Sequence, residues 1–248
     1  MNELFGQTRD CVKSRYALRT PSGYVPSWLP GWSNATPVVQ ISPEMGARFS
    51  QWQVTFEKNG QGRGNTGSSE YVVYLMAGSC AAQLAGKKYK LSPGSFAYVP
   101  PQTEFLFGQP RPGTRLLVFE KKYQALAGYE MPETIVGHAD KVTGQPFLGN
   151  KDAVLQVLLP TDPAFDLAVN LFTYQPGATL PFVETHVMEH GLVMLDGQGI
   201  YRLDADWHPV QAGDVIWMAS YCPQWFVAMG TTPACYIYYK DVNRPSLG

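Results

Sequence analysis

The chain has 248 residues, of which 16% are charged and 45% hydrophobic, and its formal net charge is −1. This charge gives no electrostatic footprint for nucleic acid or an anionic membrane, and no apolar run is long enough to span a bilayer. The 24 glycines, 20 prolines and 13% aromatic residues are typical of a compact, turn-rich all-β protein.

Residues 1–45 form an irregular N-terminal segment rich in Pro, Ser and Trp. Prolines recur between Pro21 and Trp32, which excludes a helix and favours extended geometry in the residues that precede them. We expect an arm that packs on a sheet edge, because its tryptophans would otherwise be exposed.

Cysteine usage and the N-terminal composition bear on the compartment. The first residues lack the apolar stretch of a secretory signal. The four cysteines have no CxxC spacing and need not form disulfides in a chain of this length. We therefore expect a cytoplasmic protein with thiols at Cys11, Cys80, Cys222 and Cys235.

Short apolar or alternating runs, separated by turn residues, predict strands in two groups. A linker at residues 131–150 would separate a first barrel at 46–130 from a second at 151–248. The first group is Gln51–Glu57, Tyr71–Met76, Ala81–Leu84, Ser95–Val99, Glu104–Phe107 and Arg115–Glu120. The second is Val154–Leu159, Asp166–Thr173, Glu184–Leu195, Ile200–Leu203, Val215–Met218, Trp225–Ala228 and Ala234–Lys240.

The two groups are related by a repeat, which indicates a tandem duplication of one β-domain. A constant offset superposes identical residues of the two copies over about fifty positions without a gap. The offset of 119 pairs Glu70 with Glu189, Gly78 with Gly197, Leu84 with Leu203, Gly94 with Gly213, Phe107 with Phe226 and Lys121 with Lys240.

The second copy carries a cluster of metal-binding residue types. Glu184 and His186 would leave the same face of a strand, and His190 can join them if the strand continues or bends. A lone histidine is more often a core or surface residue, but a carboxylate with two imidazoles is a typical ligand set. The spacing differs from the helical H-E-x-x-H motif. The cluster therefore predicts a metal site in the second barrel, completed by Gln224.

The first copy has no equivalent set. The same offset places Asn65, Gly67, Tyr71 and Phe105 at the positions of Glu184, His186, His190 and Gln224. These residues cannot replace the four candidate ligands, so we expect the first barrel to be structural. Glu70, the counterpart of Glu189, is present in the copy that has no metal site, which favours a structural role for Glu189. Trp217 and Trp225 are expected in the core.

The spacing of glycines and polar residues around Glu184, His186, His190 and Gln224 resembles the two sequence motifs of the cupins. In those motifs Glu184 stands at the position of the first His, His190 at the position of the Glu, and Gln224 at the position of the last His. That permutation, within two tandem barrels, resembles the (S)-ureidoglycine aminohydrolases, manganese enzymes of purine-ureide degradation. The similarity extends over Leu29–Trp32, Glu184–Leu203, Gln211–Met218, Pro223–Trp225 and Tyr239–Arg244.

This resemblance implies a bicupin that converts (S)-ureidoglycine and water to (S)-ureidoglycolate and ammonia, with Mn²⁺ held by Glu184, His186, His190 and Gln224. Oxygen and nitrogen ligands without thiolate suit Mn²⁺ or Fe²⁺ better than structural Zn²⁺. A lysine at the end of a strand is more often solvated, but the resemblance gives Lys240 a contact with substrate.

Further site residues follow from alternation along the last strand, which places Tyr236, Tyr238 and Lys240 on one face. Lys240 and Glu184 are the candidates for proton transfer, and both are also expected to contact the substrate, together with Tyr201 and Tyr236. Two alternatives remain, another metal-dependent cupin such as a dioxygenase and a non-catalytic ligand-binding bicupin. We also expect a homo-oligomer, as bicupins commonly assemble through their arms.

Overall fold

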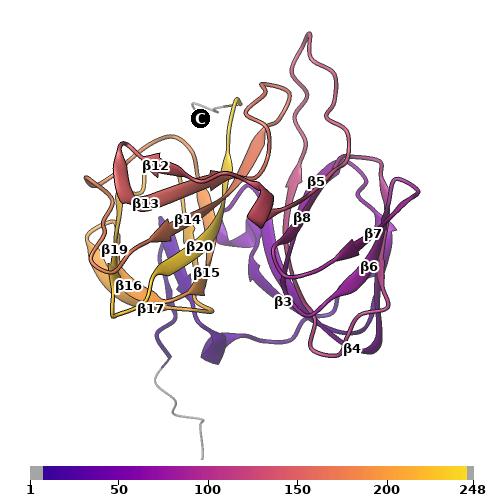
Figure 1. Ribbon diagram of the computed structural model, residues 1–248, viewed down its shortest axis with the longest axis horizontal. Coiled ribbons are helices and arrows are strands. Elements are labelled where there is room, and N and C mark those ends of the chain that lie inside the picture. The colour runs from indigo at the N-terminus through magenta and orange to yellow at the C-terminus, as the bar shows by residue number, and fades with distance from the viewer. Residues whose placement is uncertain (1–7, 245–248) are drawn as a thin grey trace, which may run out of the picture.

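The computed structural model describes residues 8–244, and nearly all of its regular structure is β-strand, which confirms the all-β prediction. Figure 1 shows two barrels side by side, the first in purple and the second in orange and yellow. The only helical elements described are single 3-10 turns, so no helix in this part of the chain is long enough to span a membrane. They lie at Pro21–Gly23, Pro43–Met45 and Ala139–Lys141.

The first barrel is one curled sheet of nine strands. Its order is β11-β8-β5-β10-β4-β9-β6-β7, and β3 pairs with β4 beside this path. The bounds are β3 Trp32–Ile41, β4 Ser50–Asn65, β5 Ser69–Ala77, β6 Cys80–Leu84, β7 Lys87–Leu91, β8 Ser95–Val99, β9 Glu104–Gly108, β10 Arg115–Lys122 and β11 Ile135–His138.

The second barrel combines an eight-stranded sheet, β1-β2-β18-β15-β20-β14-β13-β12, with a three-stranded sheet, β17-β16-β19. Isolated bridges Thr179–Val227 and Glu184–Gln224 join its chain segments near the second sheet. The bounds are β1 Cys11–Val12, β2 Tyr16–Arg19, β12 Gln145–Phe147, β13 Asn150–Val157, β14 Leu167–Tyr174, β15 His190–Asp196, β16 Gln198–Leu203, β17 Asp206–Gln211, β18 Val215–Met218, β19 Gln224–Met229 and β20 Ala234–Asp241.

The N-terminal arm contributes strands to both barrels. Its first strands, β1 and β2, extend the sheet of the second barrel, because β2 pairs with β18 from Tyr16–Met218 to Arg19–Val215. Figure 1 shows these indigo strands against the second barrel. The next strand, β3, pairs with β4 of the first barrel. The arm therefore pairs with both barrels, although it precedes both of them in the sequence.

Three clusters of buried side chains organise the core. One fills the first barrel around Val54, Leu75 and Phe107, and a second fills the other barrel around Leu203, Phe226 and Tyr236. The third lies between the barrels and draws residues from both, including Phe119 and Trp217. The four cysteines are free thiols, so burial of apolar surface and not covalent linkage holds the barrels together.

The offset between the two copies changes before β10 and β20, which corrects one prediction from the sequence, the equivalence of Lys121 and Lys240. β5 pairs with β10 through Tyr71–Glu120, and β15 pairs with β20 through His190–Lys240. Because Tyr71 and His190 are equivalent, the counterpart of Lys240 is Glu120 and not Lys121. The offset therefore becomes 120 after β9 and β19, because the stretch from Phe105 to Glu120 is one residue shorter than the stretch from Gln224 to Lys240.

Lys121 instead points toward the interface between the barrels. Its ammonium forms a buried ion pair with Asp166 of the second barrel. Beside it, Tyr98 donates a hydrogen bond of 2.7 Å to Glu70. Burial and the neighbouring carboxylate of Asp166 raise the pKa of Glu70 to about 9, so Glu70 is protonated at neutral pH. Asp166 is then the charged partner of Lys121.

We predict that Lys121→Met destabilises the protein strongly, because it leaves the fully buried Asp166 without its cation. Removal of one partner of a buried pair typically costs about 3–5 kcal/mol. The free energy of unfolding in urea measures the effect, with the exposed Lys122→Met as the matched control. A loss below about 1 kcal/mol, the value of a surface ion pair, would contradict a buried role for this contact.

Candidate metal and substrate site

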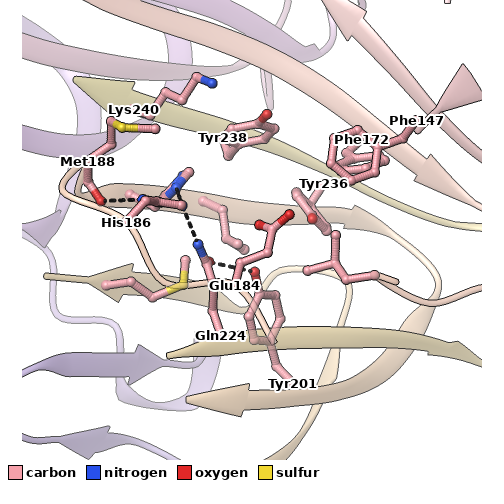
Figure 2. Close-up of a pocket in the computed structure, with 14 residues that line it drawn as sticks. Phe147, Phe172, Glu184, His186, Met188, Tyr201, Gln224, Tyr236, Tyr238 and Lys240 are labelled. Atoms are coloured by element: carbon pink, nitrogen blue, oxygen red, sulfur yellow. Dashed lines mark hydrogen bonds between the residues drawn. The ribbon is translucent and has the colours of Figure 1, made fainter. Parts of the chain in front are cut away.

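A cavity of about 210 Å³ lies inside the second barrel and contains all the side chains that the sequence predicted for the site. Figure 2 shows how they converge from β15, β16, β19, β20 and the segment before β15. The lining residues are Phe147, Phe172, Leu180, Glu184, His186, Met188, His190, Leu192, Tyr201, Met218, Gln224, Tyr236, Tyr238 and Lys240.

The predicted strand Glu184–Leu195 is shorter than expected, because regular pairing begins only at His190. Glu184 forms an isolated bridge with Gln224, through backbone hydrogen bonds of 2.8 and 2.9 Å. Between the bridge and β15 the chain turns, and the backbone N–H of Tyr221 donates to the carbonyl of His186 at 2.7 Å. The turn, and not the alternation of one strand, brings His186 beside His190.

The two imidazoles meet through their Nε2 atoms, which lie 3.0 Å apart. His186 Nδ1 is 3.0 Å from the carbonyl oxygen of Met188, which only accepts, so Nδ1 carries the proton and Nε2 presents its lone pair. His190 has a hydrogen bond to the backbone of Tyr239. Nε2 of His186 therefore directs its lone pair toward His190.

Burial keeps both histidines neutral, which is the form of imidazole that binds a metal. Desolvation lowers the pKa of His186. Desolvation, followed by the charge of His186 and that of Lys240, lowers the pKa of His190 well below its usual value. Two nitrogens bound to one ion at about 2.1 Å and a right angle lie about 3 Å apart, so the observed separation suits two ligands of one ion.

Gln224 completes this side of the cavity from β19. Its Nε2 is placed 2.9 Å from His186 Nε2, and its Oε1 accepts a hydrogen bond of 3.4 Å from the hydroxyl of Tyr201. The two ends of an amide are interchangeable within one side-chain position. The opposite orientation would present the oxygen to the histidines, as metal binding requires.

Glu184 lines the same cavity but does not yet join the histidines. Figure 2 shows its carboxylate apart from the ring of His186. Residues 8–244 accordingly contain no group of three His, Cys, Asp or Glu side chains close enough to hold an ion. Two imidazoles, an amide and a carboxylate in one cavity are nonetheless a fitting donor set for a divalent cation, with Glu184 as the side chain that would have to turn.

Lys240 lies beside His190, because the two residues pair in register across β15 and β20. Burial lowers the pKa of Lys240, and the nearby carboxylate of Glu184 opposes that shift. Burial raises the pKa of Glu184, and Lys240 opposes that shift in turn. The lysine and the glutamate thus favour each other's charged form inside the cavity.

Buried tyrosines close the inner end of the cavity. The hydroxyls of Tyr174 and Tyr236 are 3.1 Å apart, and Tyr201 and Tyr238 lie beside them. Burial raises the pKa of Tyr236 and of Tyr201 well above the usual value, so both are neutral and can donate hydrogen bonds. Phe147 of β12 also reaches the cavity, although the sequence placed it in a linker.

A network from the first barrel supports the site and was not predicted. The guanidinium of Arg48 donates to Asp241 at 2.7 Å and to Ser220 at 3.1 Å. The backbone N–H of Arg48 donates to Glu189 at 2.9 Å, and Asp241 accepts from the backbone N–H of Glu189 at 2.7 Å. Trp217 donates to the same glutamate at 3.3 Å.

This network surrounds the site residues without entering the cavity. Glu189 directly precedes His190, and Asp241 directly follows Lys240. Arg48 therefore fixes the starting point of β15 and the end of β20 together. Its contacts span 141 and 193 positions of the chain, so no local sequence pattern could reveal them.

Two stacked barrels with one candidate metal centre define a bicupin, and a family model described as a cupin domain matches residues 170–239. An (S)-ureidoglycine aminohydrolase from Arabidopsis thaliana is 38% identical, over 100% of this chain and 82% of the relative. One from Escherichia coli (strain K12) is 33% identical, over 98% and 97%. The crystal structure of protein Ylba from E. coli superposes with a TM-score of 0.86 at 31% identity and covers 98% of both chains. The chain belongs to the (S)-ureidoglycine aminohydrolase family.

We predict that Arg48→Met lowers the affinity of the site for Mn²⁺ by about tenfold or more, the usual effect of losing a group that orients a ligand. Arg48→Lys keeps the charge but loses the bidentate guanidinium, so its Mn²⁺ affinity should lie between that of Arg48→Met and that of the parent. Titration of the metal-free protein with Mn²⁺ measures this, and the exposed Arg111→Met serves as control. If Arg48→Met lowers the melting temperature but leaves the Mn²⁺ affinity unchanged, Arg48 stabilises the packing of the barrels and does not position the metal ligands.

Proposed function

We propose that the protein hydrolyses (S)-ureidoglycine to (S)-ureidoglycolate and ammonia, with Mn²⁺ in the second barrel. Relatives at 33–38% identity over nearly the whole chain carry the name (S)-ureidoglycine aminohydrolase. The observation that carries the proposal is the register of β15 and β20, which sets Lys240 directly beside His190. A cation-binding group and a fixed ammonium in one cavity suit an anionic substrate.

The metal would be held by Glu184, His186, His190 and Gln224. Oxygen and neutral nitrogen ligands without thiolate suit Mn²⁺, although such a ligand set does not by itself exclude other divalent ions. When bound, the ion would supply Lewis acidity to the oxygens of the substrate. The affinity of such a ligand set for divalent ions does not favour Mn²⁺ over the other metals, so selection of Mn²⁺ would depend on the geometry of the cavity and on the supply of metal.

Lys240 and the tyrosines would bind and orient the substrate. The ammonium of Lys240 can pair with the substrate carboxylate, a charge-assisted hydrogen bond worth about 1.5–3 kcal/mol. Tyr201 and Tyr236 present neutral hydroxyls that can donate to the ureido oxygen. Phe147 and Phe172 supply apolar walls that limit access of water. One face of the reacting carbon would then be presented to the attacking water.

The chemistry exchanges an amino group for a hydroxyl at one carbon. The C–N bond to the amino group breaks, its electron pair leaves with ammonia, and the lone pair of the ureido nitrogen forms a C=N bond to the same carbon. Water adds to the planar intermediate, and the ureido nitrogen regains its lone pair. Glu184 can accept the proton from water, and Lys240 can donate to the departing amine and be reprotonated.

We expect the Mn²⁺-loaded protein to bind about one ion per chain and to release one ammonia for each ureidoglycine consumed. His186→Ala and His190→Ala should lose both metal and ammonia release, because each removes one of the two converging nitrogens. His138→Ala, outside the cavity, is the control. Metal analysis and an ammonia assay with chiral analysis of the product test the proposal.

Other outcomes separate the competing functions. Consumption of O₂ by the iron-loaded protein would favour a dioxygenase, and tight ligand binding without ammonia release would favour a storage or binding protein. Metal binding that survives both histidine substitutions would contradict the assigned site. Cytoplasmic location and assembly into a homo-oligomer also stay predictions, which fractionation and light scattering can test.

We predict that Lys240→Met retains Mn²⁺ and the fold but loses at least about tenfold in kcat/KM, since 1.4 kcal/mol corresponds to a factor of ten. Methionine keeps most of the apolar stem and removes the charge, which separates electrostatics from packing. The exposed Lys122→Met is the control for loss of a lysine charge. A fully active Lys240→Met variant would show that the ammonium does not contact the substrate.

A further inference from the structure

The first barrel contains a cavity of about 450 Å³ to which the reaction assigns no role. Four of its lining residues are aromatic, namely Trp32, Trp52, Tyr71 and Phe105. The rings form one continuous surface, with centroids 5.6 Å apart for Trp52 and Tyr71, 5.6 Å for Tyr71 and Phe105, and 6.4 Å for Trp32 and Phe105.

This cavity occupies the place in the first barrel that the candidate active site occupies in the second. Tyr71 pairs with Glu120 as His190 pairs with Lys240. Phe105 pairs with Leu84 as Gln224 pairs with Leu203. The duplicated fold therefore keeps a pocket in both barrels. Tyr71 and Phe105 stand at the positions of His190 and Gln224, and Glu120 stands at the position of Lys240.

The replacement reverses the charge of the pocket. Glu120 lines the cavity and forms no ion pair within residues 8–244. Burial raises the pKa of Glu120, and its one favourable contact is a hydrogen bond with Ser69. Arg63 also borders the cavity, but its side chain is exposed and does not neutralise the carboxylate. A half-buried carboxylate among aromatic rings lacks a counter-ion.

The aromatic wall is a second feature that suits a cation. The indole Nε1–H of Trp52 is itself buried, so the ring of Trp52 and not its N–H borders the cavity. Faces of tryptophan and tyrosine attract organic cations, most strongly where water is excluded.

We propose that the first barrel is a binding site for a small organic cation, such as an amine or quaternary ammonium alcohol. Glu120 pairs with the ammonium, and the rings of Trp32, Trp52 and Tyr71 surround its carbon substituents. The site is separate from the one in the second barrel and needs no metal.

Choline and ethanolamine are the probes, and 3,3-dimethyl-1-butanol is the neutral molecule with the shape of choline. Calorimetric titration of the full chain should give a Kd of about 1 mM or tighter for at least one cation. The neutral analogue should bind the protein at least about tenfold more weakly than choline, because cation–π and ionic attraction are lost.

Glu120→Gln should weaken cation binding by at least about tenfold with an unchanged melting temperature, because the carboxylate that pairs with the ammonium is lost. Glu104→Gln, an exposed carboxylate on β9 outside the cavity, should bind as the parent does. Lys240→Met should also leave cation affinity unchanged, which separates this site from the one in the second barrel.

Three results would each overturn the proposal. Neither cation binds at about 10 mM, far above the expected Kd. Choline and its neutral analogue bind equally, which would leave only an apolar cavity. Glu120→Gln binds choline as tightly as the parent does, which would place the cation elsewhere. Failure of ammonia release has no bearing on these measurements, since the titrations use metal-free protein.

Discussion

The pairing of β15 with β20 is the constraint on which both the site and the packing of the two barrels depend. Alternation along β20 directs Tyr236, Tyr238 and Lys240 into the cavity, and Ile237 and Tyr239 into the cluster between the barrels. A shift of one residue would exchange these faces and bury the lysine in the interface. The contact of Arg48 with Asp241 fixes the end of this strand from the other barrel, so the register and the domain packing stabilise each other.

The same pairing in the first barrel leads to different chemistry. β5 and β10 place Tyr71 beside Glu120 facing inward, while Lys121 faces the interface. Each barrel thus keeps an inward polar residue on its last strand, and each places a charged group in the interface. Duplication preserved the backbone geometry and left the side chains of the first pocket free to change. The first barrel therefore supports the second through its packing and retains a pocket of its own.

Much of this arrangement could be predicted from the sequence, because it depends on residue type and alternation. The convergence of His186, His190 and Gln224 followed from their chemistry, although a turn and not one strand brings them together. The prediction that Lys121 is the repeat counterpart of Lys240 was wrong. A length difference of one residue between the copies cannot be detected from sequence where lysines happen to coincide at the uncorrected offset. β7 and β17 were missed because their exposed polar residues carry no apolar pattern. Arg48 could not be found, because its role arises only from packing between distant segments.

The central claim is that one barrel holds the metal and the other does not. Crystals grown with Mn²⁺ and measured for anomalous scattering test it directly, since the signal locates the ion without reference to activity. The account predicts a single strong anomalous peak per chain, in contact with Nε2 of both His186 and His190, with Glu184 turned toward it. A peak in the first barrel beside Tyr71 and Glu120, or full occupancy at a position that neither histidine contacts, would contradict the account.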